Sequence, residues 1–179
     1  MKAFFAKMKG GAQIPPRMPM REILCSFLGG FLGIGTCGFL SHYFFEPRDL
    51  VLIIGSMGAS AVLVYGAIKS PLAQPRNLIG GHVISGLVGV LSFQLMPYNI
   101  VLSSALAVSL AIAVMSLTKT LHPPGGATAL IAVIGGDKIH SLGFLYPFVP
   151  AGAGALVLLI VALITNNIAR SSKYPEYWF

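Results

Sequence analysis

Two short glycine-rich segments hold the residues of this sequence that are best suited to binding a small ligand. The first is Gly55-Ser56-Met57-Gly58-Ala59-Ser60, and the second is His122-Pro123-Pro124-Gly125-Gly126-Ala127-Thr128. Each ends in a hydroxyl side chain and leads into an apolar stretch that predicts a helix. The first turn of a helix presents unpaired N–H groups and the positive end of its dipole, and glycines let a ligand approach the backbone. Each segment is therefore a candidate site for a small anion.

Both segments are expected to begin outside a helix. Residues 50–54 are aliphatic and partly β-branched, which favours an extended run, and the following residues 59–68 favour a helix. A helix cannot continue through Pro123 and Pro124, so we expect it to resume at Ala127. Each segment then supplies a half-helix near the middle of the membrane. The backbone N–H groups around residues 58–60 and 126–128 would bind the anion.

Two histidines are the titratable residues nearest to these segments, and both are candidates for a pore or gate residue. His122 opens the second segment and could supply a proton or a hydrogen bond. His82 follows two glycines, and either an interhelical hydrogen bond or a place in the pore lining would explain it. His42 and His140 fall in or beside expected loops, where solvent would surround them.

The composition is that of an integral membrane protein. Of the 179 residues, 55% are hydrophobic and only 9% are charged, whereas soluble domains carry about a quarter charged residues. This balance excludes an ordinary soluble enzyme or nucleic-acid binder. The net charge of +7 comes from 12 Lys and Arg against 5 Asp and Glu. Because the positive residues lie at the ends of apolar runs, we interpret them as topology determinants and expect no nucleic-acid partner.

Five apolar runs are long enough to cross a membrane as helices, which takes about 20 residues. They are residues 23–44, 50–68, 78–95, 100–118 and 144–165. A sixth stretch, residues 123–136, is shorter and opens with two prolines, so it is either re-entrant or a broken span. Six crossings with a cytoplasmic N-terminus place 10 of the 12 Lys and Arg residues inside, against 9 for five crossings and 7 if residues 50–68 also re-enter. The positive-inside rule thus favours six.

The two glycine-rich segments also resemble each other. Residues 58–63 (GASAVL) recur 68 positions later as residues 126–131 (GATALI), and the same shift places residues 78–95 within the last apolar run. Three crossings per half is an odd number, so the halves would have opposite orientations. The sequence thus predicts an all-α membrane protein of two inverted three-segment repeats, with segments 2 and 5 broken near the midplane. The alternative is a chance likeness of Gly- and Ala-rich membrane segments.

These boundaries divide the chain into an arm, a membrane domain and a tail. Residues 1–22 form a cytoplasmic or interfacial arm and residues 167–179 a similar tail, in which Tyr174, Tyr177 and Trp178 suggest an interfacial belt. Residues 23–166 form the membrane domain, with repeats at 23–96 and 97–166. Small-residue pairs such as Gly29 with Gly33 are more typical of tight helix packing than of a ligand site.

No arrangement of residues typical of an enzyme is present. The sequence has no paired carboxylates inside an apolar run, no His and Cys set at metal-binding spacing, no phosphate-binding loop and no nucleophile elbow. All five acidic residues fall at expected helix ends or in loops, which also argues against cation transport. We therefore predict no catalytic residues, no metal and no cofactor.

The run His122-Pro123-Pro124-Gly125-Gly126-Ala127 resembles the HPP family of integral membrane proteins, which is named for its His-Pro-Pro tripeptide. The resemblance covers about residues 23–166 and includes residues 58–61 and the stretch from Pro75 to His82. It implies a small membrane protein of the kind usually described with four spans. Plant chloroplast and cyanobacterial members are associated with nitrite transport, so the resemblance implies nitrite as a substrate. Our six segments depart from four, and two broken segments would explain why hydropathy scans miss them.

These observations predict a transporter or channel for a small monovalent anion, with nitrite as the first candidate. The partners would be the anion, the lipid bilayer and further copies of the chain, because so small a protomer encloses little interior. We expect a bacterial inner membrane protein with both termini in the cytoplasm. The alternative is a non-transporting membrane subunit or sensor whose glycines serve packing alone.

Overall fold

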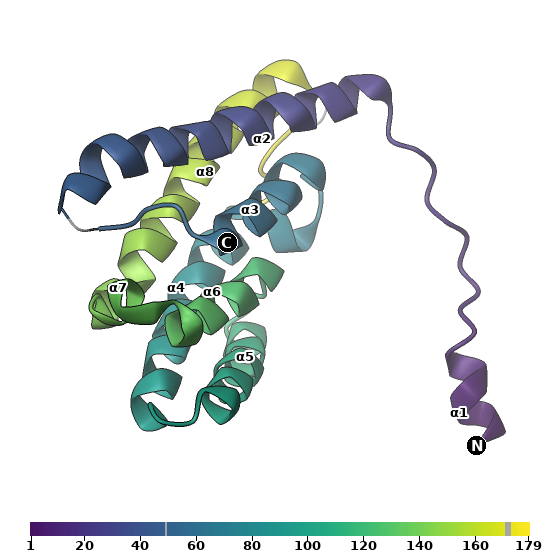
Figure 1. The fold of residues 1–179 in the computed structure, drawn as a ribbon. Coiled ribbons are helices and arrows are strands. Elements are labelled where there is room, and N and C mark those ends of the chain that lie inside the picture. Colours follow the sequence, from purple (N-terminus) through teal and green to yellow (C-terminus); the bar gives the residue numbers. More distant parts are fainter. Residues whose placement is uncertain (49, 171–172) are drawn as a thin grey trace.

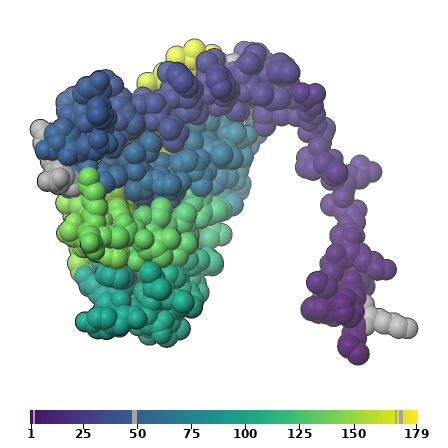
Figure 2. Space-filling model, in the orientation of Figure 1, coloured from purple at the N-terminus to yellow at the C-terminus, as the bar shows by residue number. Residues whose placement is uncertain are grey.

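The structure, a computed structural model, describes residues 1–48, 50–170 and 173–179, and these ranges hold helices and turns but no strand. α1 (Lys2–Lys7) ends an arm that stands away from the body of the molecule (Figures 1 and 2). The body consists of α2 (Met20–Leu40), α3 (Gly55–Ala61), α4 (Pro75–Leu95), α5 (Ile100–Leu117), α6 (Pro123–Ile134), α7 (Gly136–His140) and α8 (Ala153–Ala169).

Four helical stretches in the described ranges are long and apolar enough to cross a membrane, by length and composition. They are Met20–Phe45, Pro75–Leu95, Ile100–Leu117 and Gly143–Ile168. The prediction of an all-helical membrane protein is confirmed. The run at residues 50–68 is no long helix, because it is helical only from Gly55 through a π-helical turn that ends at Gly66. α3 and α6 are thus both short apolar helices among longer ones.

Local sequence explains where several helices begin. Pro75 and Pro123 each occupy the first helical position, where a missing N–H costs nothing and a fixed φ favours the helix. Asn99 caps α5, and its side-chain oxygen accepts a hydrogen bond from the Leu102 N–H at 3.1 Å. Ser70 caps the short turn Pro71–Ala73 in the same way, with Leu72 as donor at 3.2 Å. This turn leads directly into α4.

α4 is the central helix of the bundle. It packs against α5, α6 and α8, while α2 lies across α8 and the π-helical turn that ends α3 (Figure 1). One apolar core joins α2, α3, α4 and α8, and a second joins α4, α5 and α6. The glycine-rich segments lie where these cores meet, because α3 belongs to the first core, and α6 contributes Ala132 to the first and Ala129 and Val133 to the second.

The Tyr65 ring fills a gap that two glycines leave in α2. Carbons placed at the Cβ positions of Gly29 and Gly33 would overlap this ring. The Tyr65 hydroxyl donates to the Leu158 carbonyl at 2.9 Å, which fixes the ring between α2 and α8. The prediction that Gly29 and Gly33 serve helix packing is confirmed.

The C-terminal tail folds back onto the bundle. Tyr174 is buried, its hydroxyl donates to the Ala73 carbonyl at 2.8 Å, and burial raises the pKa of this phenol. The side chain of Asn167 pairs with the Tyr174 backbone, and the Glu176 N–H donates to the Gln74 side chain at 2.8 Å. The prediction that Tyr174 belongs to an interfacial belt was therefore wrong. Its hydroxyl has a protein partner, so the ring packs inside.

The glycine gap in α2 generates the first prediction. Gly33→Ala should lower the free energy of unfolding by about 1–3 kcal/mol, because the added methyl group overlaps a ring that cannot retreat. Gly30→Ala is the matched control, since a Cβ there has no neighbour within 4 Å and Ala favours the helix by up to about 1 kcal/mol. Denaturant unfolding in detergent micelles measures both. Equal midpoints for the two variants would contradict this account of the packing.

Candidate functional site

Five buried side chains from three helices form a continuous polar chain in the apolar interior. We call it the hydroxyl–imidazole chain, and its members are Ser56, Ser60, His82, His122 and Thr128. None of the five residues has measurable exposed surface. α3 supplies the two serines, α4 supplies His82, and α6 supplies Thr128 together with His122 at its N-terminal cap.

The Ser60 hydroxyl is the central link. Its Oγ lies 2.7 Å from His82 Nε2 and 2.9 Å from His122 Nε2. His82 Nδ1 lies 2.7 Å from Thr128 Oγ1, which in turn lies 2.9 Å from Ser56 Oγ. The chain ends at the backbone, because His122 Nδ1 lies 2.7 Å from the Leu72 carbonyl oxygen. Four side-chain hydrogen bonds thus join residues from both halves of the sequence.

Glycines bring α4 and α6 close enough for these contacts. A Cβ placed at Gly81 would lie 2.5 Å from the Cβ of His122 and 3.0 Å from the Thr120 carbonyl oxygen. A Cβ placed at Gly125 would lie 3.0 Å from the Gly81 carbonyl oxygen and 3.1 Å from Ser85 Oγ. Both positions therefore require the absence of a side chain, and they hold His122 against α4.

The helical period decides which predicted residues face the chain. Ser56 and Ser60 are four residues apart and share the inner face of α3, whereas Gly55, Gly58 and Ala59 are exposed on its other side. In the second segment Pro124, Gly125 and Thr128 are buried. Gly126 and Ala127 are half-buried, and Pro123 is exposed. The structure thus brings together the predicted hydroxyls and both imidazoles, but not the outward-facing small residues.

The half-helices begin earlier than the sequence analysis expected. α3 starts at Gly55 and not Ala59, and α6 starts at Pro123 and not Ala127, because prolines fit the first turn of a helix. The N–H groups from Gly58 and Gly126 onward therefore lie inside helices, where the preceding turn accepts them. Prolines carry no N–H, and the Gly125 N–H donates to the His122 carbonyl at 2.8 Å. At α6 the available donors are consequently side chains.

Sequence reasoning missed two partners of the residues in this chain, one a backbone carbonyl and the other a tyrosine hydroxyl. The Leu72 carbonyl precedes His122 by 50 positions, and the Tyr146 hydroxyl donates to the Thr128 carbonyl at 2.8 Å. A carbonyl group is common to every residue, so the sequence holds no signal for Leu72. His140 also differs from expectation: it is half-buried, stacks on Phe93 with ring centroids 3.9 Å apart, and contacts the Val133 carbonyl.

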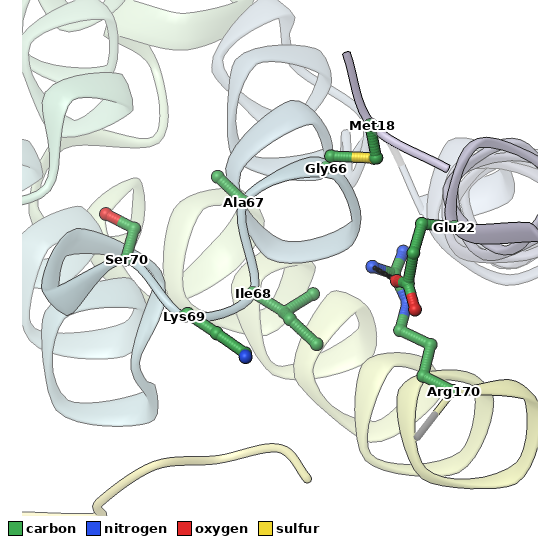
Figure 3. Close-up of a pocket in the computed structure, with 8 residues that line it drawn as sticks. All are labelled: Met18, Glu22, Gly66, Ala67, Ile68, Lys69, Ser70 and Arg170. Carbon is green, nitrogen blue, oxygen red and sulfur yellow. Dashed lines mark hydrogen bonds and ion pairs between the residues drawn. The ribbon is translucent and has the colours of Figure 1, made fainter. Parts of the chain in front are cut away.

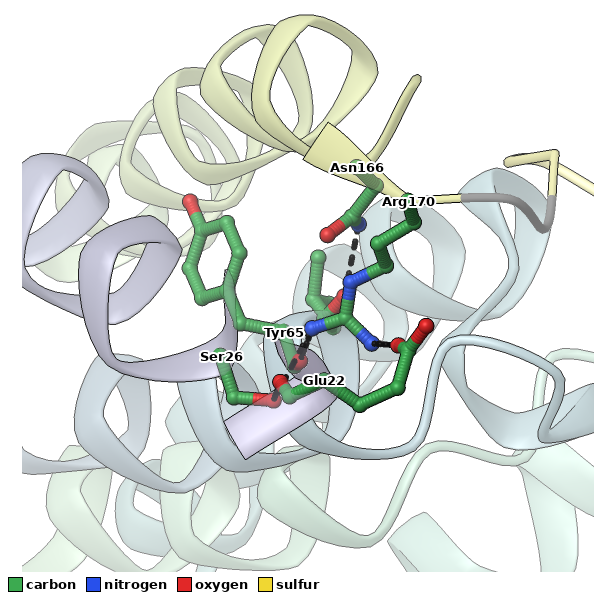
Figure 4. A network of polar contacts seen from close by, with 6 residues as sticks. Glu22, Ser26, Tyr65, Asn166 and Arg170 are labelled. Carbon is green, nitrogen blue, oxygen red and sulfur yellow. Dashed lines mark hydrogen bonds and ion pairs between the residues drawn. The ribbon is translucent and has the colours of Figure 1, made fainter. Parts of the chain in front are cut away.

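A second polar feature lies where α2 and α8 meet. Arg170 Nη1 lies 2.8 Å from Glu22 Oε2, Nη2 donates to Ser26 Oγ at 2.9 Å, and Nη2 also contacts the Tyr65 carbonyl (Figure 4). A pocket of about 460 Å³ opens beside this network (Figure 3), between Met18, Glu22, residues 66–70 and Arg170. Glu22 already neutralises the Arg170 charge, so this network fastens two helix ends together. The hydroxyl–imidazole chain is the stronger candidate for a ligand site.

Comparison with known proteins agrees with this architecture. Residues 15–175 match the model of the HPP family transmembrane region, and the chain belongs to this family. Two transmembrane proteins of Dictyostelium discoideum are similar to it. One is 46% identical, with 98% of this chain and 57% of the relative covered, and the other is 45% identical, with 92% and 59% covered. The chain thus spans less than two thirds of the length of these relatives. No solved structure matches it.

The central position of Ser60 generates the second prediction. Ser60→Ala should lower the free energy of unfolding by about 1–3 kcal/mol, because it leaves two buried imidazole nitrogens without a partner. Ser109→Ala is the matched control: this exposed hydroxyl bonds only within its own helix, and the change should stay within about 0.5 kcal/mol. Thermal unfolding in detergent compares the two. If Ser60→Ala and the control have the same midpoint of thermal unfolding, Ser60 does not connect the helices in the folded protein.

Proposed function

We propose that this protein is a transporter or channel for a small monovalent anion, with nitrite as the first candidate, and that it is not an enzyme. The hydroxyl–imidazole chain is the observation that carries the proposal. It places hydroxyl and imidazole donors from α3, α4 and α6 at one point inside a membrane protein. Polar groups are costly in such an interior and are typically functional there.

The chemistry of the chain suits an anion better than a cation. Hydroxyl groups and imidazole N–H groups donate hydrogen bonds, and an anion needs such donors when it leaves water. The described acidic residues Glu22, Glu46, Asp137 and Glu176 lie at helix ends or in the tail, and none forms a hydrogen bond or ion pair with the chain. A cation would therefore find no carboxylate there. Because these donors carry no full positive charge, they suit a monovalent anion better than a divalent one.

The packing of the helices supports the inverted repeat that the sequence suggests. α2 packs on α8 and on α3 with its π-helical end, and α5 packs on α4 and α6. In an inverted repeat, α2, α3 and α4 would be equivalent to α5, α6 and α8. The contact of α2 with α8 then corresponds to that of α5 with α4, and the contact of α2 with α3 corresponds to that of α5 with α6. α3 and α6, which would be equivalent, contact each other at the centre. In this proposal the two half-helices of an inverted repeat form the anion site.

The setting of the protein is part of the same proposal. We propose a homo-oligomer in a bacterial inner membrane with both termini in the cytoplasm. The membrane itself is supported by the family and by the transmembrane relatives. The alternative is a membrane subunit or sensor without transport activity, in which the glycines at 81 and 125 serve packing alone. The two proposals differ in one measurable property, which is anion flux.

Anion uptake into proteoliposomes tests the proposal directly. We expect saturable nitrite uptake by the purified protein when nitrite, nitrate, formate and chloride are compared at two pH values. His122→Ala should reduce nitrite uptake at least about tenfold, because it removes the imidazole that joins α6 to Ser60 and Leu72. Flux assays with equal amounts of inserted protein measure this.

His42→Ala is the control for this experiment, since His42 is exposed and contacts only its sequence neighbours Glu46, at 3.3 Å, and Tyr43. It should transport like the unmodified protein. Circular dichroism and gel filtration establish that each variant is folded. Absence of flux for all four anions in a folded, inserted protein would reject transport and favour the subunit or sensor.

A further inference from the structure

We propose that the hydroxyl–imidazole chain is a proton relay that carries one proton between Ser56 and His122, and that the Leu72 carbonyl sets its direction. The proposal deepens the proposed function, since it makes transport proton-coupled. Its geometry stands independently of that function, because every link lies between 2.7 and 2.9 Å. These are the distances of good hydrogen bonds.

The Leu72 carbonyl oxygen fixes the first proton. A carbonyl oxygen only accepts, so His122 Nδ1 must carry hydrogen. When His122 is neutral, its Nε2 then has a lone pair and accepts the Ser60 hydroxyl proton. Ser60 has only one proton, so its oxygen must accept from His82 Nε2–H. One backbone group thus determines the tautomers of both histidines.

The same reasoning continues to the far end of the chain. A neutral His82 with hydrogen on Nε2 has a lone pair on Nδ1, which accepts the Thr128 hydroxyl proton. In the structure the Thr128 hydroxyl donates to Ser56 Oγ at 2.9 Å; in the neutral chain both hydroxyl groups rotate, and Thr128 Oγ1 accepts from Ser56. All hydrogen bonds of the neutral chain therefore point one way, from Ser56 towards Thr128 and His82, and from His82 through Ser60 to His122.

One added proton reverses every bond. Ser56 has no exposed surface in the closed chain, so the chain must open for a hydronium ion to give a proton to Ser56 Oγ, whose own proton then passes to Thr128. Thr128 passes its proton to His82 Nδ1, His82 passes the proton on Nε2 to Ser60, and Ser60 passes its proton to His122 Nε2. Each O–H or N–H bond that breaks is replaced by one that forms. The net result is a neutral water molecule, an imidazolium at His122 and a His82 whose hydrogen lies on Nδ1.

In the protonated state every imidazole nitrogen keeps a hydrogen-bond partner, and only the Ser56 hydroxyl hydrogen has no acceptor among the five residues. His122 then donates from Nε2 to Ser60 and from Nδ1 to Leu72, Ser60 donates to His82 Nε2, His82 donates to Thr128, and Thr128 donates to Ser56. The two states differ by one proton and by the direction of four bonds. No heavy atom has to change its partner, so the relay needs only rotation of hydroxyl groups and short proton hops.

The surroundings leave the two imidazoles as the groups that titrate in the chain. Their rings are 5.1 Å apart between centroids. The Ser85 hydroxyl of α4 donates to the His82 carbonyl and lies with the Met115 sulfur of α5 beside Gly125, and the Tyr146 hydroxyl donates to the Thr128 carbonyl. In the described ranges, no hydrogen bond or ion pair joins an Asp, Glu, Lys or Arg side chain to the five residues.

Because no charged side chain of the described residues pairs with the chain, an anion would balance the positive charge of the protonated relay. An isolated charge is costly in a low-dielectric interior, and a charge of the opposite sign beside it offsets much of that cost. The imidazolium at His122 and a monovalent anion would therefore enter together. Transport would move one proton with each anion.

Nitrogen NMR of the full chain in lipid bilayers tests the relay without any flux measurement. The protein is labelled with ¹⁵N-histidine, and the signals of His42 and His140 are assigned from their loss in His42→Gln and His140→Gln. When both imidazoles are neutral, we expect the hydrogen on Nδ1 of His122 and on Nε2 of His82. As the pH falls, His122 should become doubly protonated, and His82 should switch to Nδ1–H at the same midpoint.

Thr128→Val separates the relay from a merely structural network, because it keeps the side-chain shape and removes the donor to His82. The variant should lose the coupled switch, whereas Ser116→Ala, an exposed hydroxyl on α5, should keep it. If Thr128→Val does not fold, Ser60→Cys, a weak donor at the central link, should shift the two midpoints apart.

Three results would overturn the relay: a neutral His122 with hydrogen on Nε2, a His122 that never becomes doubly protonated, or a His82 that keeps its tautomer while His122 titrates. The failure of the relay and of the transport proposal are distinguishable. Nitrite flux without a tautomer switch rejects the relay alone. A tautomer switch without flux of any anion supports the relay and rejects transport.

Discussion

The hydrogen bonds of Ser60 to two imidazoles are the interaction on which the centre of this protein depends. α3 and α6 are too short to carry their ends to the membrane surface, so polar groups at those ends remain in the interior. A membrane interior offers no water to satisfy them. Ser60 reaches His82 on α4 and His122 at the start of α6, and thereby gives both imidazoles a partner. Without the Ser60 hydroxyl, the packing of these helices would place two imidazole nitrogens in the interior without hydrogen-bond partners.

The close approach of α4 and α6 is the steric condition for this interaction. Any side chain at Gly81 would displace His122, and a Cβ at Gly89 would lie 2.5 Å from the Ala129 carbonyl oxygen, about two turns further along α6. The glycines of α4 thus form a surface onto which α6 fits along its length. Such contacts are typical of membrane helices, where tight packing replaces the hydrophobic effect as the driving force. Packing and polar chemistry are therefore linked here, because the same glycines that admit α6 also set the distances in the chain.

The sequence predicts the residue types of the site better than its geometry. Ser60, Thr128, His82 and His122 were all identifiable, because hydroxyls and histidines stand out in apolar runs. Gly58 and Ala59 were grouped with them because a helix was expected to begin there and to present its N–H groups, yet α3 begins earlier and its period turns both residues outward. The helix starts at Gly55 and Pro123 were placed too late because a proline or glycine was taken as a break and not as a first turn. The role of Leu72 and the inward packing of Tyr174 depend on long-range contacts that leave no local pattern.

The distribution of bonds between the two halves bears on how an anion would enter. Of the four side-chain bonds in the chain, Ser60 to His82 lies within the first half, and three cross between halves: Ser60 to His122, His82 to Thr128 and Ser56 to Thr128. Each net hydrogen bond contributes about 0.5–1.5 kcal/mol, so breaking these three bonds costs on the order of a few kcal/mol. The helix packing and the other hydrogen bonds between the halves add to this cost. An anion that accepts the freed hydroxyl and N–H donors would recover part of this cost, and the closed chain is therefore consistent with a site that opens only with its ligand.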